Sequence, residues 1–510
     1  MRHDKMDFGS RKAFMLFFAM LLVSGCSGNN QGNGNSPEET AESPGDTPEA
    51  RDAADAGEQH DSVELSELSD SGEIVPENID GDAGDAPGDS SMYEESEKTP
   101  EQWEAYDSIH SDSRDSEAEN ETRAEAESNA QCGNGLTEGN EKCDGQVQDC
   151  TTKDGKPGVR ACSPYCNEFF ACVSRELPPS GSPYPRSPIL SGISFDRSSW
   201  VKAAGGSDQF GQTIASNNNV YLAWGDGGGF GGSNSQGRVS LGVARIEGVP
   251  PNWKAHNVWG GVNHESSQQT IQGKANGGIV AIGGILYLNV AEQGVWTNSR
   301  LWKSTNFGLT WVQVGRLFNE PNGAFAGCGI LQFGPGNEGA RDSYIYGYDT
   351  SAFKNGLAMF RVAARDIETR SKYEFFTGLD INGNPTWSGD ISKIKPVFKD
   401  SKGTEWGVTA VYDPYVRRYL LAVRHNGESG DWGLFDAAEP WGPWTTVAYG
   451  ADFPGWTYTP DPDGASRNRP AYMHQFPQSW MSNDGITIWH MSDRGDQFNL
   501  MKATLHLVGP

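Results

Sequence analysis

The sequence predicts an all-β fold for residues 187–510, in the form of a five-bladed β-propeller. This region is rich in Gly, Trp, Tyr and Asn, and its short β-branched and aromatic runs alternate with turn residues without helical periodicity. Five hairpin-like units also recur along it, at intervals of roughly 50 to 80 residues that leave room for four strands each. A concanavalin-like sandwich is the alternative, and the repeats favour the propeller.

Each repeated unit consists of two predicted strands joined by a turn. The units span residues 211–224, 278–290, 329–348, 407–423 and 477–491. Residues 304–311, between the second and third units, read Ser-Thr-Asn-Phe-Gly-Leu-Thr-Trp. This stretch resembles the Asp-box, which stabilises a turn between outer strands in sialidase-like propellers, so it supports the fold. A sialidase activity is disfavoured, because we find no Phe/Tyr-Arg-Ile-Pro start.

The N-terminus has the features of an export signal. Arg11 and Lys12 precede an apolar run over residues 13–23, which is too short to span a bilayer. Small residues then lead directly to Cys26, and this order resembles the bacterial lipobox, in which the cysteine is acylated. We therefore predict a signal peptide over residues 1–25 and a lipid anchor on Cys26 as the sole membrane attachment. Because Ser27 is not an aspartate, we expect an outer-membrane or cell-surface location. An ordinary signal peptide with a chance cysteine is the alternative.

An acidic segment follows the predicted anchor. Residues 27–131 contain 31 Asp or Glu and only 4 Lys or Arg, so they carry almost the whole net charge of −28. Such a segment buries too little apolar surface to offset its ordering entropy, and like charges extend it. We predict a disordered tether over residues 26–131. The absence of a basic stripe argues against a nucleic-acid partner.

Six clustered cysteines mark a small module over residues 132–175. In an exported protein they predict about three disulfides, for which fifteen pairings are open. A zinc site is the competing interpretation, and we predict no metal. The Cys-Gly-Asn-Gly opening resembles myxobacterial cysteine-rich repeats, which favours a structural collar or an adhesive element. Cys328 is left over as a predicted buried free thiol. The six predicted disulfide cysteines are Cys132, Cys143, Cys150, Cys162, Cys166 and Cys172.

Two aspartates of the first unit are the predicted catalytic pair. In a propeller blade, the start of the first strand and the end of the second meet at the same rim of the central channel. Reflection about the turn at Asn217 and Asn218 places Asp208 opposite Asp226, where cross-strand Cβ atoms are about 5 Å apart. Two such carboxylates suit glycoside hydrolysis, one as acid and one as nucleophile or water activator. Which aspartate is the acid, and whether the anomeric configuration is retained or inverted, stays open.

Other polar and aromatic residues are expected to bind substrate around the same rim. Second strands end near Glu292, Asp349, His425 and Asp493, which together would form a polar ring. The structural alternatives are core tryptophans, Asp226 as a turn residue, and Asp493 and Asp496 as blade-closing caps. A calcium ion would suit the acidic rim, but no ligand spacing requires one, so we predict no cofactor. The predicted substrate-binding residues are Gln212, Trp224, Phe230, Glu292, Asp349, His474, Gln475 and Trp480.

Several short motifs resemble one family of glycoside hydrolases, the bacterial endo-D-arabinanases. They are Asp-Gln-Phe-Gly at 208–211, Trp-Gly-Asp-Gly at 224–227, Tyr-Leu-Leu at 419–421, Glu-Pro-Trp-Gly-Pro-Trp at 439–444 and Asp-Gly at 484–485. The resemblance covers most of residues 195–507. It implies a five-bladed propeller, cleavage within α-D-arabinofuranosyl chains of mycobacterial arabinogalactan and lipoarabinomannan, and Asp208 and Asp226 as the catalytic pair. The glycine-rich run at 227–232 departs from the family.

Two functions from different classes therefore stand. The first is an endo-acting hydrolase with a polysaccharide as its partner, built on a propeller that we expect to be monomeric. The second is a non-catalytic carbohydrate-binding or adhesive propeller. They differ at the carboxylates, because a binding protein needs only one of the two or neither.

Overall fold

The computed structural model describes residues 132–134, 136–275, 277–292, 296–427, 430–450, 453–454 and 470–510. The predicted signal peptide, Cys26 and the acidic tether lie outside these residues. Within the described part of the chain, no helix is long and apolar enough to cross a membrane.

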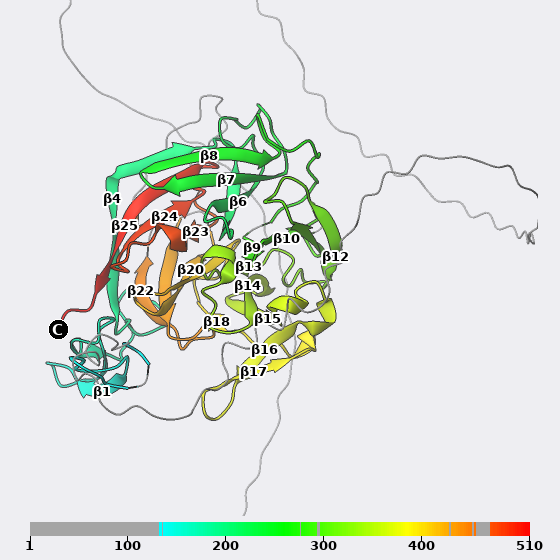
Figure 1. The fold of residues 1–510 in the computed structure, drawn as a ribbon. Coiled ribbons are helices and arrows are strands. Elements are labelled where there is room, and N and C mark those ends of the chain that lie inside the picture. The colour runs from blue at the N-terminus through cyan, green and yellow to red at the C-terminus, as the bar shows by residue number, and fades with distance from the viewer. Residues whose placement is uncertain are drawn as a thin grey trace, which may run out of the picture. The chain divides into compact units, whose positions relative to one another are not determined.

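The described residues form five antiparallel sheets that are the blades of a β-propeller, as predicted (Figure 1). In each blade the first strand is innermost, and β9, β13 and β23 lie toward the middle of the fold (Figure 1). Blade 1 consists of β5 (Asp208–Ile214), β6 (Val220–Gly225), β7 (Leu241–Val249) and β8 (Asn252–Trp259). Blade 2 consists of β9 (Ile279–Ile282), β10 (Ile285–Ala291), β11 (Ser299–Ser304) and β12 (Val312–Phe318).

The third blade is enlarged, and the fifth closes the ring. Strand β4, from the start of the propeller, pairs with β25 from its end, so the two ends of the domain share one sheet. Blade 3 consists of β13 (Gly329–Ile330), β14 (Tyr344–Phe353), β15 (Gly356–Ala363), β16 (Glu374–Leu379) and β17 (Pro385–Ser388), with β18 (Phe398–Lys399) beside β15. Blade 4 consists of β19 (Val408–Asp413), β20 (Arg418–Arg424), β21 (Trp432–Ala437) and β22 (Thr445–Gly450). Blade 5 consists of β23 (His474–Gln475), β24 (Thr487–Ser492), β25 (Phe498–Leu507) and β4 (Leu190–Ala203).

Four of the five predicted hairpins match the structure, and the fifth is displaced. The predicted strand over residues 477–481 is wrong, because Gln478–Trp480 form a 3-10 turn and the first strand is His474–Gln475. Pro477 explains the difference, since its ring lacks the N–H that would continue the ladder. The remaining 3-10 turns of the described chain are Pro335–Asn337, Ala364–Asp366, Arg370–Lys372 and Ile391–Lys393.

The Asp-box lies where the motif predicts, in the turn between the outer strands β11 and β12. The Ser304 hydroxyl accepts a hydrogen bond from the Gly308 N–H at 2.8 Å, and the Asn306 side chain accepts one from the Thr310 N–H at 3.0 Å. Trp311 ends the motif and is buried against Trp259 of blade 1. The motif therefore fixes a turn and joins blade 2 to its neighbour.

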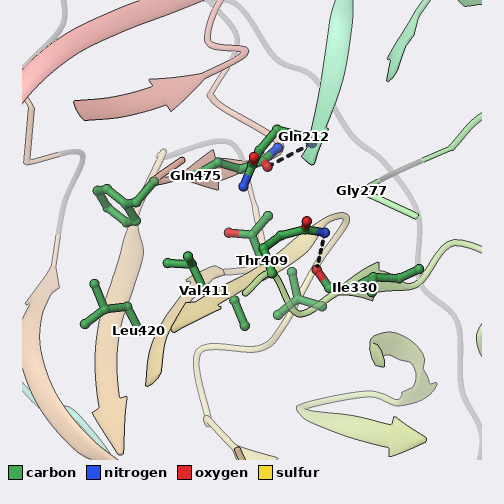
Figure 2. A pocket seen from close by; sticks show the side chains of 11 residues that line it. Gln212, Gly277, Ile330, Thr409, Val411, Leu420 and Gln475 are labelled. Carbon is green, nitrogen blue, oxygen red and sulfur yellow. Dashed lines mark hydrogen bonds between the residues drawn. The ribbon is translucent and has the colours of Figure 1, made fainter. Parts of the chain in front are cut away.

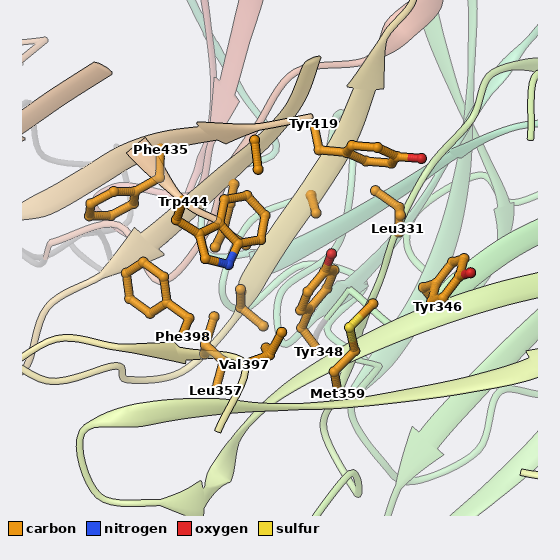
Figure 3. Close-up of a cluster of buried hydrophobic side chains, with 14 of the residues drawn as sticks. Leu331, Tyr346, Tyr348, Leu357, Met359, Val397, Phe398, Tyr419, Phe435 and Trp444 are labelled. Carbon is orange, nitrogen blue, oxygen red and sulfur yellow. The ribbon is translucent and has the colours of Figure 1, made fainter. Parts of the chain in front are cut away.

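Aromatic cores lie between adjacent blades. Between blades 3 and 4, Tyr348 and Met359 pack toward Tyr419, Phe435 and Trp444 (Figure 3). Each fully buried side chain of this size contributes about 1.5–3 kcal/mol by leaving water. Packing of this kind holds the blades in fixed positions around the channel, which the site described below requires.

The cysteine-rich module is held by three disulfides, as predicted, and the zinc alternative is wrong because all six thiols are bonded. The pairs are Cys132–Cys166, Cys143–Cys162 and Cys150–Cys172, around a sheet of β1 (Val147–Thr151), β2 (Pro157–Ala161) and β3 (Val173–Ser174). Cys328 is a buried free thiol, also as predicted.

The module rests on the turn ends of blades 4 and 5. The Arg417 guanidinium, in the β19–β20 turn, donates to the Cys132 carbonyl at 2.7 Å. The Tyr165 hydroxyl donates to the carbonyl of Asp484, in the turn before β24, at 3.0 Å. These turns lie where first strands end, which is the opposite face from the rim where Asp208 begins β5. The module therefore leaves that rim uncovered.

Candidate active site

The two predicted catalytic aspartates flank the first hairpin, but they do not face each other across it. Asp208 pairs with Gly225, and a bulge follows because the next paired residue is Gly211, opposite Ala223. Asp226 lies one residue beyond β6, with a left-handed φ of 51°. The predicted register is therefore wrong by one residue, because simple reflection takes no account of a bulge.

A lysine from the next blade brings the two carboxylates together. The Lys274 Nζ lies 2.8 Å from Asp226 Oδ1 and 3.8 Å from Asp208 Oδ1. Since both oxygens contact one nitrogen, they are at most about 6.6 Å apart, the sum of these two distances. Lys274 is placed by backbone hydrogen bonds to Ala291 at the end of β10. Arg238 adds a second cation, 3.3 Å from Asp226 Oδ1.

The two aspartates have different surroundings. The Asp208 side chain is 10% exposed and that of Asp226 is 33% exposed. Burial raises the pKa of Asp208 well above its usual range, Lys274 opposes the rise, and the nearby charges of Asp493, Asp226 and Asp496 add to it. Asp208 is thus suited to hold a proton, while Asp226 carries ion pairs to two cations.

Gly225 provides the space in which these groups meet. A Cβ atom at this position would lie 2.6 Å from Lys274 Nζ and 2.8 Å from Asp208 Oδ1. Contacts below 3.0 Å would force the lysine and the aspartate to move. The glycine of the Trp-Gly-Asp-Gly motif therefore leaves room for the close approach of these charged side chains, which a larger residue would displace.

The glycine-rich run beside Asp226 is an ordered loop. The Asn257 side chain accepts from the Phe230 N–H at 3.0 Å and donates to the carbonyls of Phe230 at 3.0 Å and Val262 at 2.8 Å. The Ser207 hydroxyl accepts from the Gly229 N–H at 3.1 Å. Gly229, with φ of 69°, must lack a Cβ, which would lie 2.4 Å from Asn257 Oδ1. The glycine-rich run that follows Asp226 is therefore held in one conformation by Asn257 and Ser207.

Three other acidic residues that were predicted at the rim form hydrogen bonds or ion pairs within the fold. Asp493 accepts from the N–H groups of Gln209 and Tyr472, each at 2.7 Å, and so caps blade 5 against blade 1. Asp349 accepts from Ser351 N–H, and burial raises the pKa of both Asp349 and Asp493 to about 6. Glu292 pairs with Arg300 at 2.7 Å, and the hydrogen bond from that guanidinium lowers the pKa of Glu292.

Most of the predicted aromatic and histidine contacts lie in the core. Trp224 and Trp480 are buried in the cluster between blades 1 and 5, and Phe230 packs against Phe498 at 5.2 Å. His474 is buried and stacks on Trp432 at 3.9 Å, and desolvation lowers its pKa well below the usual value. These side chains pack in or against the core and stabilise the propeller. His425, at the end of β20, is likewise buried, 3.3 Å from Asp400.

The central channel is narrow, and it is lined by the first strands. Gln212 and Gln475 point toward each other there, with the Gln212 N–H donating to Gln475 Oε1 at 3.2 Å (Figure 2). Ile330, Thr409 and Val411 contribute from blades 3 and 4. The cavity that these residues line has a volume of about 10 Å³, about enough for one water molecule. A larger ligand could therefore contact this face of the propeller only at the rim where the first strands begin, which we call the mouth.

Two residues of the mouth were not predicted from the sequence. Lys274 and Trp406 precede the first strands of blades 2 and 4, much as Asp208 begins that of blade 1. The shared position at the entry to each blade is a signal that could have found them.

No family model and no curated protein matches this chain. Solved structures with a similar arrangement include an α-L-arabinofuranosidase from Podospora anserina, with 10% identity, 62% of this chain and 95% of that chain covered, and a TM-score of 0.35. The catalytic domain of a GH62 α-L-arabinofuranosidase from Coprinopsis cinerea shows 9% identity, 65% and 100% coverage, and a TM-score of 0.36. A GH43_1 enzyme from Xanthomonas citri shows 12% identity, 60% and 91% coverage, and a TM-score of 0.35. At such identities and scores, the activity of this chain has to be argued from its own residues.

Proposed function

We propose that this protein is a surface-anchored, endo-acting glycoside hydrolase that cleaves α-D-arabinofuranosyl linkages in D-arabinan. The observation that carries the proposal is the meeting of two carboxylates in unlike environments at the mouth of the propeller. Glycoside hydrolysis needs one protonated and one ionised carboxyl group beside the scissile bond. The buried Asp208 and the doubly ion-paired Asp226 match these two requirements.

The proposed mechanism assigns one role to each charged group. Asp208 is the general acid, and its proton passes to the glycosidic oxygen as the bond to the anomeric carbon breaks. The carboxylate that remains lies 3.8 Å from the Lys274 ammonium, which stabilises the new negative charge. Asp226 is the ionised partner that attacks the anomeric carbon and forms a glycosyl ester. Water then cleaves this ester, Asp208 takes the proton of that water, and both carboxyl groups return to their starting states.

The choice of D-arabinan rests on the resemblance of the motifs at 208–211, 224–227 and 439–444. The endo mode fits a channel that is too narrow for a sugar, since a chain lying across the mouth extends to both sides of the carboxylates. Export through the 1–25 signal and anchorage on Cys26 are part of the same proposal, because arabinan of neighbouring cells is an extracellular polymer.

The test is incubation of the full chain with mycobacterial arabinogalactan, followed by chromatography of the released oligosaccharides. We expect a ladder of fragments from the natural protein and none from Asp208→Asn or Asp226→Asn. Asp380→Asn, in the exposed β16–β17 turn, is the matched control and should cleave normally. Near-normal activity in either mouth variant would contradict the assignment of the pair.

A carbohydrate-binding propeller is the second candidate, and one observation favours it. Lys274 already pairs with both carboxylates, an arrangement that could be purely structural. This function predicts that the protein binds arabinan, releases no fragments from it, and binds it equally well after Asp226→Asn.

A further inference from the structure

One tryptophan at the mouth is both exposed and conformationally strained. The Trp406 residue is 40% exposed, although only Gly407 separates it from the innermost strand of blade 4. Its φ is 57°, a left-handed value that is a genuine outlier for a bulky residue. Such strain costs about 1–3 kcal/mol and persists only where the surroundings impose it, most often at functional sites.

Neighbouring groups fix the backbone on both sides of this tryptophan. The Thr350 hydroxyl, from blade 3, donates to the Trp406 carbonyl at 2.9 Å. Glu405 is held by Arg424, whose Nη1 lies 2.8 Å from Glu405 Oε2. Gly407 packs so tightly that a Cβ would lie 2.4 Å from the Met473 side chain. The exposed indole is therefore presented in a set direction and not by a loose loop.

The indole is also supported from beneath and connected to the proposed acid. The ring of Tyr472, itself buried, lies 4.8 Å from the Trp406 ring at an interplanar angle of 57°. The Tyr472 N–H donates to Asp493, whose other carboxylate oxygen accepts from the N–H of Gln209, next to Asp208. One buried carboxylate thus ties the aromatic support to the backbone of the catalytic strand.

We propose that Trp406 is the stacking platform of a sugar-binding subsite at the mouth, on the side of Asp208 formed by blades 4 and 5. Its ligand is a neutral sugar ring of a polymeric glycan, whose apolar C–H face packs on the indole while its hydroxyls stay in water. This inference rests on the proposed function and adds to it a residue that holds the chain across the mouth. A large, rigid aromatic ring gives contact area at little entropic cost, which explains why strain is tolerated here.

The kinetic test compares Trp406→Ala with the natural full chain on mycobacterial arabinogalactan. We expect KM to rise about tenfold with kcat changed less than threefold, because the platform binds ground state and transition state alike. Trp406→Phe should recover most of the affinity, since it restores an aromatic face. Tyr415→Ala is the matched control, an aromatic that is 38% exposed at the opposite end of the same strand, and it should leave KM unchanged.

A second measurement separates a binding role from a structural one. Trp406→Gly removes the ring and also relieves the left-handed strain, so its melting temperature should equal or exceed that of the natural chain while KM rises as in Trp406→Ala. A KM within twofold of the natural value in both variants would overturn the platform. A decrease in the melting temperature of Trp406→Gly that is large enough to explain the rise in KM would also overturn the platform.

Failure of this inference is distinguishable from failure of the proposed function. Binding of arabinan fragments to Asp226→Asn, followed by tryptophan fluorescence, does not require catalysis. If the natural chain releases no fragments but binding falls about tenfold with the added Trp406→Ala change, the platform stands and the hydrolase assignment falls. If the natural chain cleaves and the Trp406→Ala chain binds and cleaves as well, the platform alone is wrong.

Discussion

Replacement of Lys274 by methionine tests directly whether its ammonium group stabilises the two carboxylates at the mouth. Methionine keeps most of the apolar stem and removes the ammonium that lies 2.8 Å from Asp226 and 3.8 Å from Asp208. At an effective dielectric constant near 20, Coulomb's law gives about 6 kcal/mol for the attraction to Asp226 and, once Asp208 has lost its proton, about 4 kcal/mol for the attraction to Asp208. The cost of burying the lysine offsets part of these two attractions. Asp226 is 33% exposed, so solvent screens its attraction to Lys274.

Two effects on activity follow from the loss of this cation. The carboxylate left on Asp208 after proton transfer loses its stabilising partner, so kcat should fall about a hundredfold, as it does when one preorganised electrostatic contact is removed. Lys274 also lowers the pKa of Asp208, so its removal must raise that pKa further. Because a general acid works only while protonated, the alkaline limb of the pH profile should move to higher pH.

The assay is the rate of reducing-end release from arabinogalactan, measured across pH for the natural chain and for Lys274→Met. Lys303→Met is the matched control, because Lys303, near the end of β11 in blade 2, pairs with Glu368 of blade 3 at 2.9 Å, away from the mouth. Activity within twofold of the natural chain, or an alkaline limb that stays in place or moves down, would refute the proposed role of Lys274.

Two further predictions concern stability and stereochemistry. Burial raises the pKa of Asp413 from 3.8 to about 7, so the folded protein keeps a proton that the unfolded chain has released, and stability falls as pH rises between about 4 and 7. Asp413→Asn should therefore be more stable than the natural chain above pH 7 by up to about 4 kcal/mol in urea unfolding, and a gain that is equal at all pH values would contradict this reasoning. The limit of about 6.6 Å between the Asp208 and Asp226 oxygens favours retention of anomeric configuration, for which carboxyl groups lie about 5–5.5 Å apart. Proton NMR of the first-formed product decides this, and inversion would show that the pair acts on an intervening water.

The fold was predictable because its signals are local. Each blade begins with a hairpin whose turn and strand residues are adjacent in sequence, and the Asp-box of residues 304–311 fixes its own turn through its own side chains. The closure of the ring was not predictable in the same way, since it pairs β4 with β25 across the whole propeller. The disulfide pairing was also out of reach, because cysteine spacing does not encode which thiols meet in space.

The proximity of Asp208 and Asp226 was predictable for a similar reason, but the charged groups around them were not. Asp208 and Asp226 belong to one hairpin, so sequence distance alone brings them near the mouth. The bulge after Asp208 shifts the register between β5 and β6, and neither residue type nor spacing predicts this bulge. Lys274 comes from another blade, so only the packing of blade 2 against blade 1 places its ammonium between the two carboxylates.

The buried polar residues near the rim show why residue type alone did not define the site. The strand pattern places three polar residues near the mouth, but all of them are buried. His474 stacks on Trp432, and Asp349 and Asp493 accept hydrogen bonds from backbone N–H groups. A blade end leaves N–H groups that need acceptors, so acidic residues there serve the fold first. The residues that we propose to act on a substrate are those that the fold does not fully satisfy: Asp208, whose Oδ1 accepts no hydrogen bond from the described residues, Asp226, which is partly open, and Trp406, whose strain the fold tolerates. We therefore expect unsatisfied, exposed or strained groups to mark functional positions at this mouth more clearly than residue type does.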